Sequence, residues 1–108
     1  MNYKEIYGEY AQPLVFRGVL FFQTCMACPE QYDAWYDDEQ IGYVRLRWGH
    51  LTAEYPDAGG KYVYSADIGD KVWQGCFTDN EERCEHLIKI AENLKNAKHS
   101  GEAQAVLC

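Results

Sequence analysis

Two cysteines, Cys25 and Cys28, have the spacing of a zinc knuckle or of a redox dithiol. Zinc needs two more ligands, usually from a second knuckle, but the matching turn at residues 55–60 contains no cysteine. The remaining candidate ligands are Cys76, Cys84 and His86. The βα context that lowers the pKa of a redox thiol is also missing. We therefore expect no cofactor, with zinc at Cys25 and Cys28 as the alternative to a plain turn.

The histidines of the chain are His50, His86 and His99. None of them belongs to a recognisable nucleophile motif, and Ser65 and Ser100 lack the strand–turn–helix context of a nucleophile elbow. The acidic run at residues 37–39 does not have the spacing of an EF-hand loop. We therefore expect no catalytic residues and no enzymatic activity.

One face of a central hairpin carries a group of residues that suits an anion. The group consists of Tyr43, Arg45, Arg47 and His50. Two guanidinium groups on one face can hold the phosphate or carboxylate of a small ligand, such as a nucleotide, through paired hydrogen bonds. Alternatively, Glu54 and neighbouring acidic residues pair with the arginines in a solvated sheet face. The sequence favours the second interpretation and leaves the first open.

An acidic turn and several aromatic residues are the predicted contacts with a partner protein. Acidic side chains steer a protein toward a basic surface, and large aromatic side chains carry much of the binding energy at interfaces. The predicted contact residues are Trp35, Tyr36, Asp37, Asp38, Glu39 and Trp73.

The composition limits the classes of partner. The chain of 108 residues has 17 acidic and ten basic side chains, for a formal net charge of −7. Because proteins that contact phosphates of nucleic acid concentrate Lys and Arg, we expect no direct nucleic-acid binding. The longest apolar run, at residues 19–22, is too short to cross a bilayer. We expect a cytoplasmic protein without membrane contact, a monomer or homodimer, with mostly reduced thiols.

The element that positions the arginines is a predicted β-hairpin at residues 43–55, turned at Trp48-Gly49. Pairing Arg47 with His50 sets the register of the two strands, since side chains alternate between faces. One face then carries Val44, Leu46, Leu51 and Ala53. The other carries Tyr43, Arg45, Arg47, Thr52 and Glu54.

Other strands are expected on both sides of this hairpin. The predicted strands cover residues 14–24, 31–36 and 61–68, with a strand or loop at residues 72–77. Arg17-Gly18 marks an edge or bulge in the first of them. The third places Tyr62, Tyr64, Ala66 and Ile68 on one face. Residues 1–13 are expected to form a short helix or an extended arm.

A C-terminal helix is predicted over residues 78–99. Thr78 or Asp79 can cap it. Its apolar stripe consists of Cys84, Leu87, Ile88, Ala91 and Leu94. Ser100-Gly101 is expected to end the helix, with residues 100–108 as a tail. The whole chain is then a single α+β domain, in which residues 14–77 form an antiparallel meander of four to five strands packed against this helix.

Three segments carry a resemblance to known proteins. They are Cys28-Pro29-Glu30-Gln31-Tyr32-Asp33, the segment Gly42 to Gly49, and Tyr55-Pro56-Asp57-Ala58-Gly59-Gly60. In this order, with an acidic helix start, they resemble small uncharacterised proteins of phages and prophages of Gram-positive bacteria. The resemblance covers roughly residues 25–95. Such relatives are expected to have a cysteine near the Gly-Gly turn, where this chain has Ala58.

The resemblance implies a context for the function. Small acidic phage proteins without catalytic motifs commonly bind a host protein, and some inhibit restriction or CRISPR nucleases. The expected function is therefore protein–protein contact that inhibits or modulates a host or defence protein, in the manner of an anti-CRISPR inhibitor. A small anionic-ligand binder using Arg45 and Arg47 is the first alternative, and a zinc-stabilised interaction module is the second.

Overall fold

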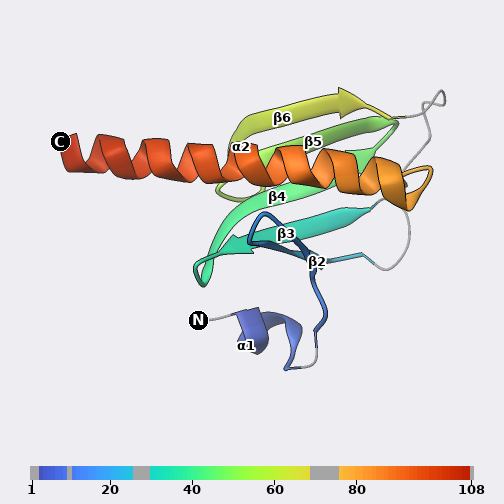
Figure 1. Ribbon diagram of the computed structural model, residues 1–108, viewed down its shortest axis with the longest axis horizontal. Coiled ribbons are helices and arrows are strands. Elements are labelled where there is room, and N and C mark those ends of the chain that lie inside the picture. The colour runs from blue at the N-terminus through green and yellow to red at the C-terminus, as the bar shows by residue number, and fades with distance from the viewer. Residues whose placement is uncertain (1–2, 10, 26–29, 69–75, 108) are drawn as a thin grey trace.

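The computed structural model describes residues 3–9, 11–25, 30–68 and 76–107, with side chains up to residue 100. Six antiparallel strands form one sheet in the order β1-β2-β3-β4-β5-β6, and a long helix crosses one face of it (Figure 1). The elements are α1 (Tyr3–Tyr7), β1 (Leu14–Phe16), β2 (Val19–Gln23), β3 (Gln31–Tyr36), β4 (Glu39–Arg47), β5 (His50–Tyr55), β6 (Lys61–Asp67) and α2 (Asn80–Leu107). The predicted α+β class is confirmed, with six strands rather than four to five.

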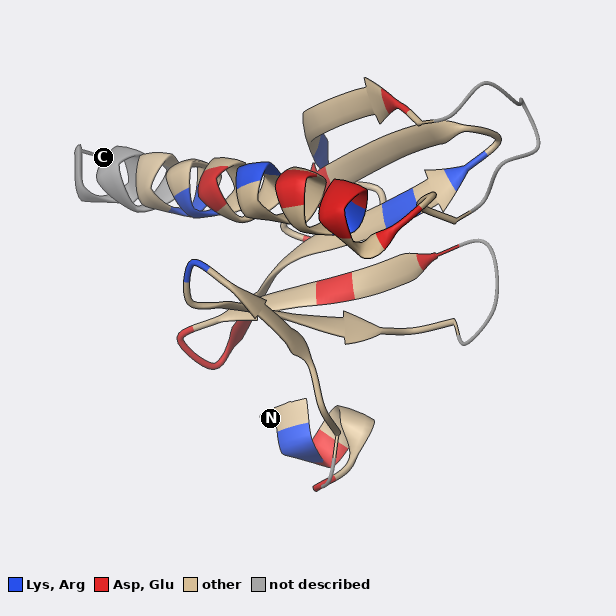
Figure 2. Ribbon diagram, turned by 45° about the vertical axis from the view of Figure 1, so that its right-hand side comes forward, with Lys and Arg blue, Asp and Glu red and all other residues tan. Residues whose placement is uncertain are grey.

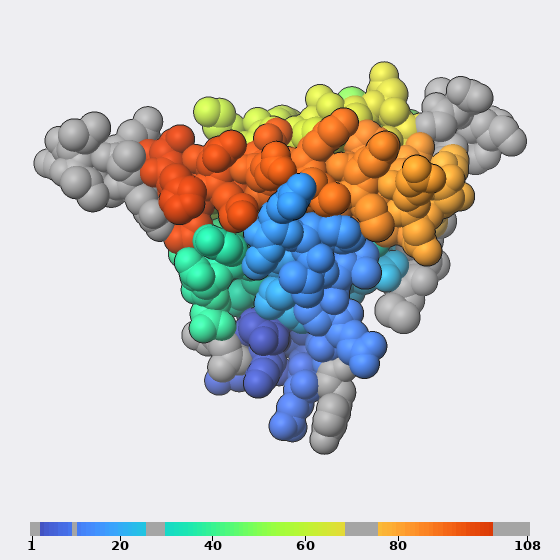
Figure 3. Space-filling model, viewed as in Figure 1, coloured from blue at the N-terminus to red at the C-terminus, as the bar shows by residue number. Residues whose placement is uncertain are grey.

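The additional strand comes from the segment 14–24, which was predicted as one strand. Arg17 and Gly18 both have positive φ, at 53° and 81°, so the chain reverses there and β1 pairs with β2. Two successive positive φ angles define the tight hairpin turn whose twist matches that of the flanking strands. The predicted edge or bulge is therefore a hairpin turn. Figure 3 shows this hairpin beside α2, where Lys95 Nζ donates to Arg17 O at 2.7 Å.

The central hairpin has the predicted register. Arg47 pairs with His50, Leu46 with Leu51 and Tyr43 with Glu54. The turn residues Trp48 and Gly49 have φ angles of 57° and 72°, as a two-residue turn requires. The apolar face is fully buried, with exposed fractions of 0–1% for Val44, Leu46, Leu51 and Ala53. This hairpin supplies two interior strands of the sheet.

Strand β6 departs from simple alternation. Ala53 pairs with Tyr64 but Glu54 pairs with Tyr62, so Val63 is an extra residue in β6. A bulge of this kind shifts the side chains that follow it to the other face. Tyr64 therefore packs against the core under α2, whereas Tyr62 is 64% exposed. The predicted common face for Tyr62 and Tyr64 is wrong for this reason.

Helix α2 covers the apolar face of the sheet. Asp79 caps it, since its Oδ1 accepts the Glu82 N–H at 2.8 Å, and Glu82 Oε1 accepts the Thr78 N–H at 2.9 Å. The fully buried side chains are Leu87, Ile90, Ala91 and Leu94. The predicted apolar stripe included Ile88, but Ile88 is only partly buried, and the fully buried residue is Ile90 instead.

The C-terminal end of α2 differs from the prediction. The helix begins at Asn80 and continues through Gly101 to Leu107, so the predicted tail at residues 100–108 is wrong up to Leu107. A single glycine costs about 1 kcal/mol in a helix, which the good helix formers at residues 102–107 offset. Figure 1 shows this end of α2 extending beyond the sheet.

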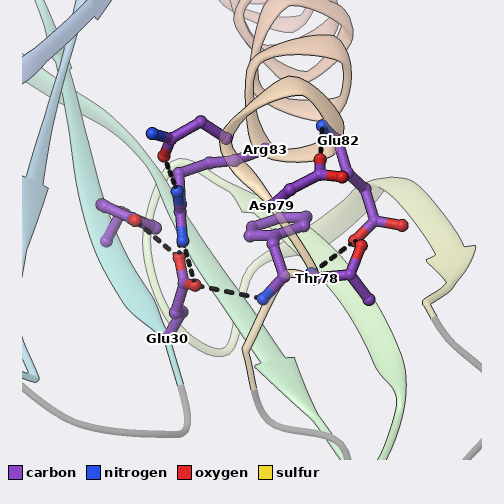
Figure 4. Close-up of polar contacts among 8 residues, drawn as sticks. Glu30, Thr78, Asp79, Glu82 and Arg83 are labelled. Carbon is purple, nitrogen blue, oxygen red and sulfur yellow. Dashed lines mark hydrogen bonds and ion pairs between the residues drawn. The ribbon is translucent and has the colours of Figure 1, made fainter.

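A buried carboxylate ties the start of β3 to the start of α2 (Figure 4). Glu30 is 4% exposed and accepts from Arg83 Nη2 at 2.7 Å and Arg83 Nε at 3.0 Å. Tyr32 Oη donates to the same carboxylate at 2.7 Å, and the Phe77 N–H donates at 3.1 Å. Burial favours the neutral acid, but these four donors outweigh it and hold the pKa of Glu30 below its usual value.

The N-terminal segment forms the short helix α1 on the sheet face opposite α2. Tyr7 stacks on Phe22 with ring centroids 4.4 Å apart. Its hydroxyl donates to Asp33 and accepts from Trp35 Nε1 at 3.0 Å. Burial raises the pKa of Asp33 above its usual value. Helix α1 thus covers β2 and β3 on this face, and no helix of the described residues covers the β4–β6 half, which we term the open half.

Candidate functional site

The open half of the sheet carries a shallow depression of about 270 Å³. Its lining residues, Arg45, Arg47, Trp48, His50, Thr52 and Tyr62, form what we term the arginine–aromatic surface. They come from β4, the β4–β5 turn, β5 and β6. Because Val44 and Leu46 are buried on the α2 side, the alternating Arg45 and Arg47 point to the opposite face. Figure 2 shows the two basic bands of β4 together near the end of that strand.

The arginines of this surface lack the acidic partners that the sequence favoured. Arg17 pairs with Glu92 at 3.4 Å and Arg83 pairs with Glu30 at 2.7 Å. Within the described part of the chain, neither Arg45 nor Arg47 has a carboxylate within 4.0 Å. The predicted partner Glu54 is 8% exposed and accepts the Gly59 N–H at 3.3 Å instead.

Two exposed aromatic rings flank the arginines. Trp48 is 65% exposed at the tip of the β4–β5 turn, and Tyr62 is 64% exposed on β6. The guanidinium carbon of Arg47 lies 5.5 Å from the centroid of the Trp48 ring, within the range of a cation–π contact. Trp48 therefore helps to orient Arg47. Among the described residues, no aromatic ring and no cation stacks on the Tyr62 ring.

The predicted group around Arg45 is brought together in part. His50 lies at the edge of the depression, with its Nδ1 3.0 Å from Asp67 Oδ1. Tyr43 is on the same face but does not line the depression, because it stands one row further along, opposite Glu54. Burial raises the pKa of Tyr43, so its hydroxyl stays protonated at neutral pH.

The predicted protein-contact residues do not form one exposed surface. Trp35 is 4% exposed beneath α1, so its prediction as an exposed aromatic is wrong. Tyr36 is partly buried, with Lys95 Nζ 5.4 Å from its ring centroid. Glu39 pairs with Lys98 at 3.3 Å. Asp37 and Asp38 are exposed, as predicted, whereas Trp73 lies outside the described residues.

The cysteines give no metal site in the described part of the chain. There, no group of three or more His, Cys, Asp or Glu side chains is placed to hold a metal ion. Cys25 and Cys84 are free and partly buried, and Cys28 lies outside the described residues. Cys76 is disulfide-bonded, which makes it an exception to the expectation of mostly reduced thiols. Since disulfides persist mainly in oxidising compartments, the cytoplasmic location stays a prediction.

The histidines are not brought together. His50 is on the open face with Asp67, whereas His86 on α2 shares a 2.7 Å hydrogen bond with Tyr64 on the opposite face of the sheet. A second depression, of about 260 Å³, lies at the start of α2. Asp79 and Glu82 in its lining are already used as helix caps, and its acidic character does not suit an anion.

Sequence reasoning missed Trp48, Thr52 and Tyr62 as members of the site. Trp48 and Thr52 were placed correctly in the hairpin, and their proximity to the arginines follows from its register. Tyr62 was assigned to the wrong face because the bulge in β6 has no clear sequence signal.

No helix of the described residues is both long and apolar enough to span a membrane. Comparison of the chain with family models, with curated proteins and with solved structures finds no match.

Proposed function

We propose that this protein is a non-catalytic binding protein that holds a small anionic ligand on the arginine–aromatic surface. The observation that carries the proposal is a pair of guanidinium groups without acidic partners among the described residues, although the protein has seven more acidic than basic side chains. Arginine presents several donors in a planar fork that matches phosphate and carboxylate. Two guanidinium groups without acidic partners, on a concave and open face, are therefore suited to bind an anion.

The arrangement also supplies neutral donors and fixed geometry. Arg45 and Arg47 are two residues apart on one strand, so their Cα atoms are about 6.8 Å apart and both side chains leave the same face. Arg47 is oriented by Trp48, which reduces the entropy lost when an anion binds. Thr52, directly opposite Arg45 in the register, adds a hydroxyl beside them. These residues are the proposed anion-binding groups.

Replacing both arginines tests this proposal. Titration of the full chain with pyrophosphate at low salt, followed by amide chemical shifts, is expected to perturb Trp48 and Gly49. In the variant Arg45→Gln/Arg47→Gln, the dissociation constant is expected to rise at least about tenfold, because each hydrogen bond to a charged group contributes about 1.5–3 kcal/mol. The double variant Arg17→Gln/Lys61→Gln removes the same charge elsewhere and is expected to change little. Equal loss in both variants contradicts a specific site.

The second candidate function is the inhibition or modulation of a host or defence protein, as in the phage proteins that the sequence resembles. A specific feature favours it: Asp37 and Asp38 are both exposed at the β3–β4 turn, with φ angles of 54° and 57°. Two adjacent carboxylates at the end of a hairpin present negative charge to a basic partner and can steer its approach.

Charge reversal at the turn tests this second function. With a partner captured from the lysate of a Gram-positive host, the variant Asp37→Lys/Asp38→Lys is expected to lower the association rate about tenfold at low salt, because steering depends on charge near the contact. The variant Glu81→Lys/Glu85→Lys makes the same net change on the exposed side of α2. If both variants slow association equally, only the net charge matters and the turn is not the contact.

A further inference from the structure

We infer that the ligand of the arginine–aromatic surface is a mononucleotide, with its phosphate on Arg45 and Arg47 and its base stacked on Tyr62. This inference rests on the proposed function, since it specifies which anion the same surface takes. It comes from what lies beside the arginines, because a phosphate alone needs no aromatic ring.

Tyr62 offers a ring face to a ligand. It is 64% exposed on the strand two positions from β4, which places its backbone about 9.6 Å from that of β4. Among the described residues, no aromatic ring and no cation stacks on the Tyr62 ring. A phosphate alone gains nothing from an exposed aromatic ring beside the two arginines. A nucleotide does, because nucleic-acid bases stack on such rings whatever their identity.

The bulge at Val63 puts this ring on the correct face. Without the extra residue, Tyr62 would share a face with Tyr64, which packs against the core and bonds to His86. The bulge separates the two tyrosines, so that one completes the core and the other lies in the lining of the depression with Arg45 and Thr52. Bulges frequently re-aim a side chain next to a functional site.

The two exposed rings have different roles in this arrangement. Trp48 is engaged by the Arg47 guanidinium at 5.5 Å, so it positions a phosphate-binding group. Tyr62 is the ring that a base can cover. Thr52 lines the depression on β5, the strand between Arg45 on β4 and Tyr62 on β6, and its hydroxyl can serve as a donor to the sugar or the phosphate.

Size and charge favour a single nucleotide over a nucleic-acid strand. The depression of about 270 Å³ lies just below the usual size range of ligand sites, and its lining contains two arginines. A net charge of −7 repels a long polyanion, which gains its affinity from many phosphate contacts. A mononucleotide needs only the groups that are present.

Titration calorimetry of the full chain with matched ligands tests the inference. AMP carries both groups, ribose 5-phosphate lacks the base, and adenosine lacks the phosphate. AMP is expected to bind roughly tenfold more tightly than ribose 5-phosphate, in line with the usual effect of base–aromatic stacking. The variant Tyr62→Ser is expected to remove this tenfold difference and to leave ribose 5-phosphate binding unchanged, which also shows that the variant is folded. The variant Tyr62→Phe keeps the ring and the difference.

The outcomes separate the inference from the proposed function. Equal affinities of AMP and ribose 5-phosphate in the unmodified protein overturn the inference, while pyrophosphate binding that depends on Arg45 and Arg47 still upholds the proposed function. A tenfold preference for AMP that survives in Tyr62→Ser also overturns the inference. A ten-residue thymidine oligonucleotide that binds more tightly than AMP at physiological salt overturns it in favour of single-stranded nucleic acid. Failure of pyrophosphate and of every phosphate ester to bind overturns both.

Discussion

Glu30→Gln is expected to lower the free energy of unfolding by about 3–5 kcal/mol, the usual effect of breaking a buried ion pair. Glu30 is 4% exposed and its carboxylate accepts four hydrogen bonds, two of them from Arg83. Glutamine has nearly the same shape, but its amide keeps one acceptor oxygen, and its NH2 group faces an Arg83 N–H together with either the Tyr32 hydroxyl or the Phe77 N–H. Arg83 is then left without its counter-charge. Chemical unfolding in urea measures the loss.

An exposed ion pair provides the matched control for Glu30. Glu92 pairs with Arg17 at 3.4 Å, with 54% of its side chain exposed. Exposed pairs contribute at most about 1 kcal/mol, so Glu92→Gln is expected to have a small effect on unfolding. If Glu30→Gln destabilises the protein no more than Glu92→Gln, the network of Glu30 does not join β3 to α2 in the way described.

The same variant changes how stability depends on pH. The donors around Glu30 lower its folded pKa below the usual value, so its contribution is complete above the usual carboxyl pKa and is lost as the pH falls through the lowered one. Protonation of Glu30 is then part of acid unfolding. The Glu30→Gln protein is expected to lose less stability between pH 5 and pH 3 than the unmodified protein.

The part of the fold that sequence predicted best is the one governed by local rules. The hairpin at residues 43–55 has the predicted register because alternation of buried and exposed residues and a Trp-Gly turn both specify it. The cap at Asp79 follows from the spacing to Glu82. Such features depend on residues close together in the chain, and these residues are visible in the sequence.

The features that sequence missed depend on contacts between distant segments. Nothing in the sequence indicated the buried role of Glu30, whose partner Arg83 is 53 positions away. Trp35 read as an exposed aromatic because its cover comes from Tyr7, which is 28 positions before it. One missed feature is local instead: the hairpin turn at Arg17-Gly18 was predicted as an edge or bulge, since arginine rarely has positive φ. No local sequence pattern predicts the contacts of Glu30 with Arg83 or of Trp35 with Tyr7.

The candidate site combines features that local sequence rules predict with features that depend on distant segments. The hairpin rules placed Arg45, Arg47 and Thr52 on one face, as the structure has them. Whether Glu54 neutralises the arginines could not be read from the sequence, since its carboxylate is turned to the Gly59 N–H by the loop that follows. Tyr62 reaches the site through a bulge two strands from Arg45. The candidate surface is therefore defined by long-range geometry, although its charges come from a local pattern.

Gly42→Ala is expected to destabilise the protein by about 1–3 kcal/mol, the usual effect of overfilling a core. Gly42 lies on β4 beneath α2, and a Cβ there would come within 2.6 Å of both Leu94 methyl carbons and 3.2 Å of Leu94 Cγ. Leu94 is fully buried. The strand and the helix would have to separate, or Leu94 would have to leave its rotamer. Urea unfolding measures the change.

Shortening Leu94 is expected to relieve this effect. Leu94→Ala alone costs about 2–5 kcal/mol because it leaves a cavity under α2. In Gly42→Ala/Leu94→Ala the new methyl group lies in that cavity, so the double variant is expected to cost less than the sum of the single variants by about 0.5–3 kcal/mol. Gly42→Ala/Leu87→Ala is the control, because Leu87 is buried two turns away, about 10.5 Å along the helix, where additivity is expected. A strictly additive Gly42/Leu94 pair would contradict the close approach of β4 and α2.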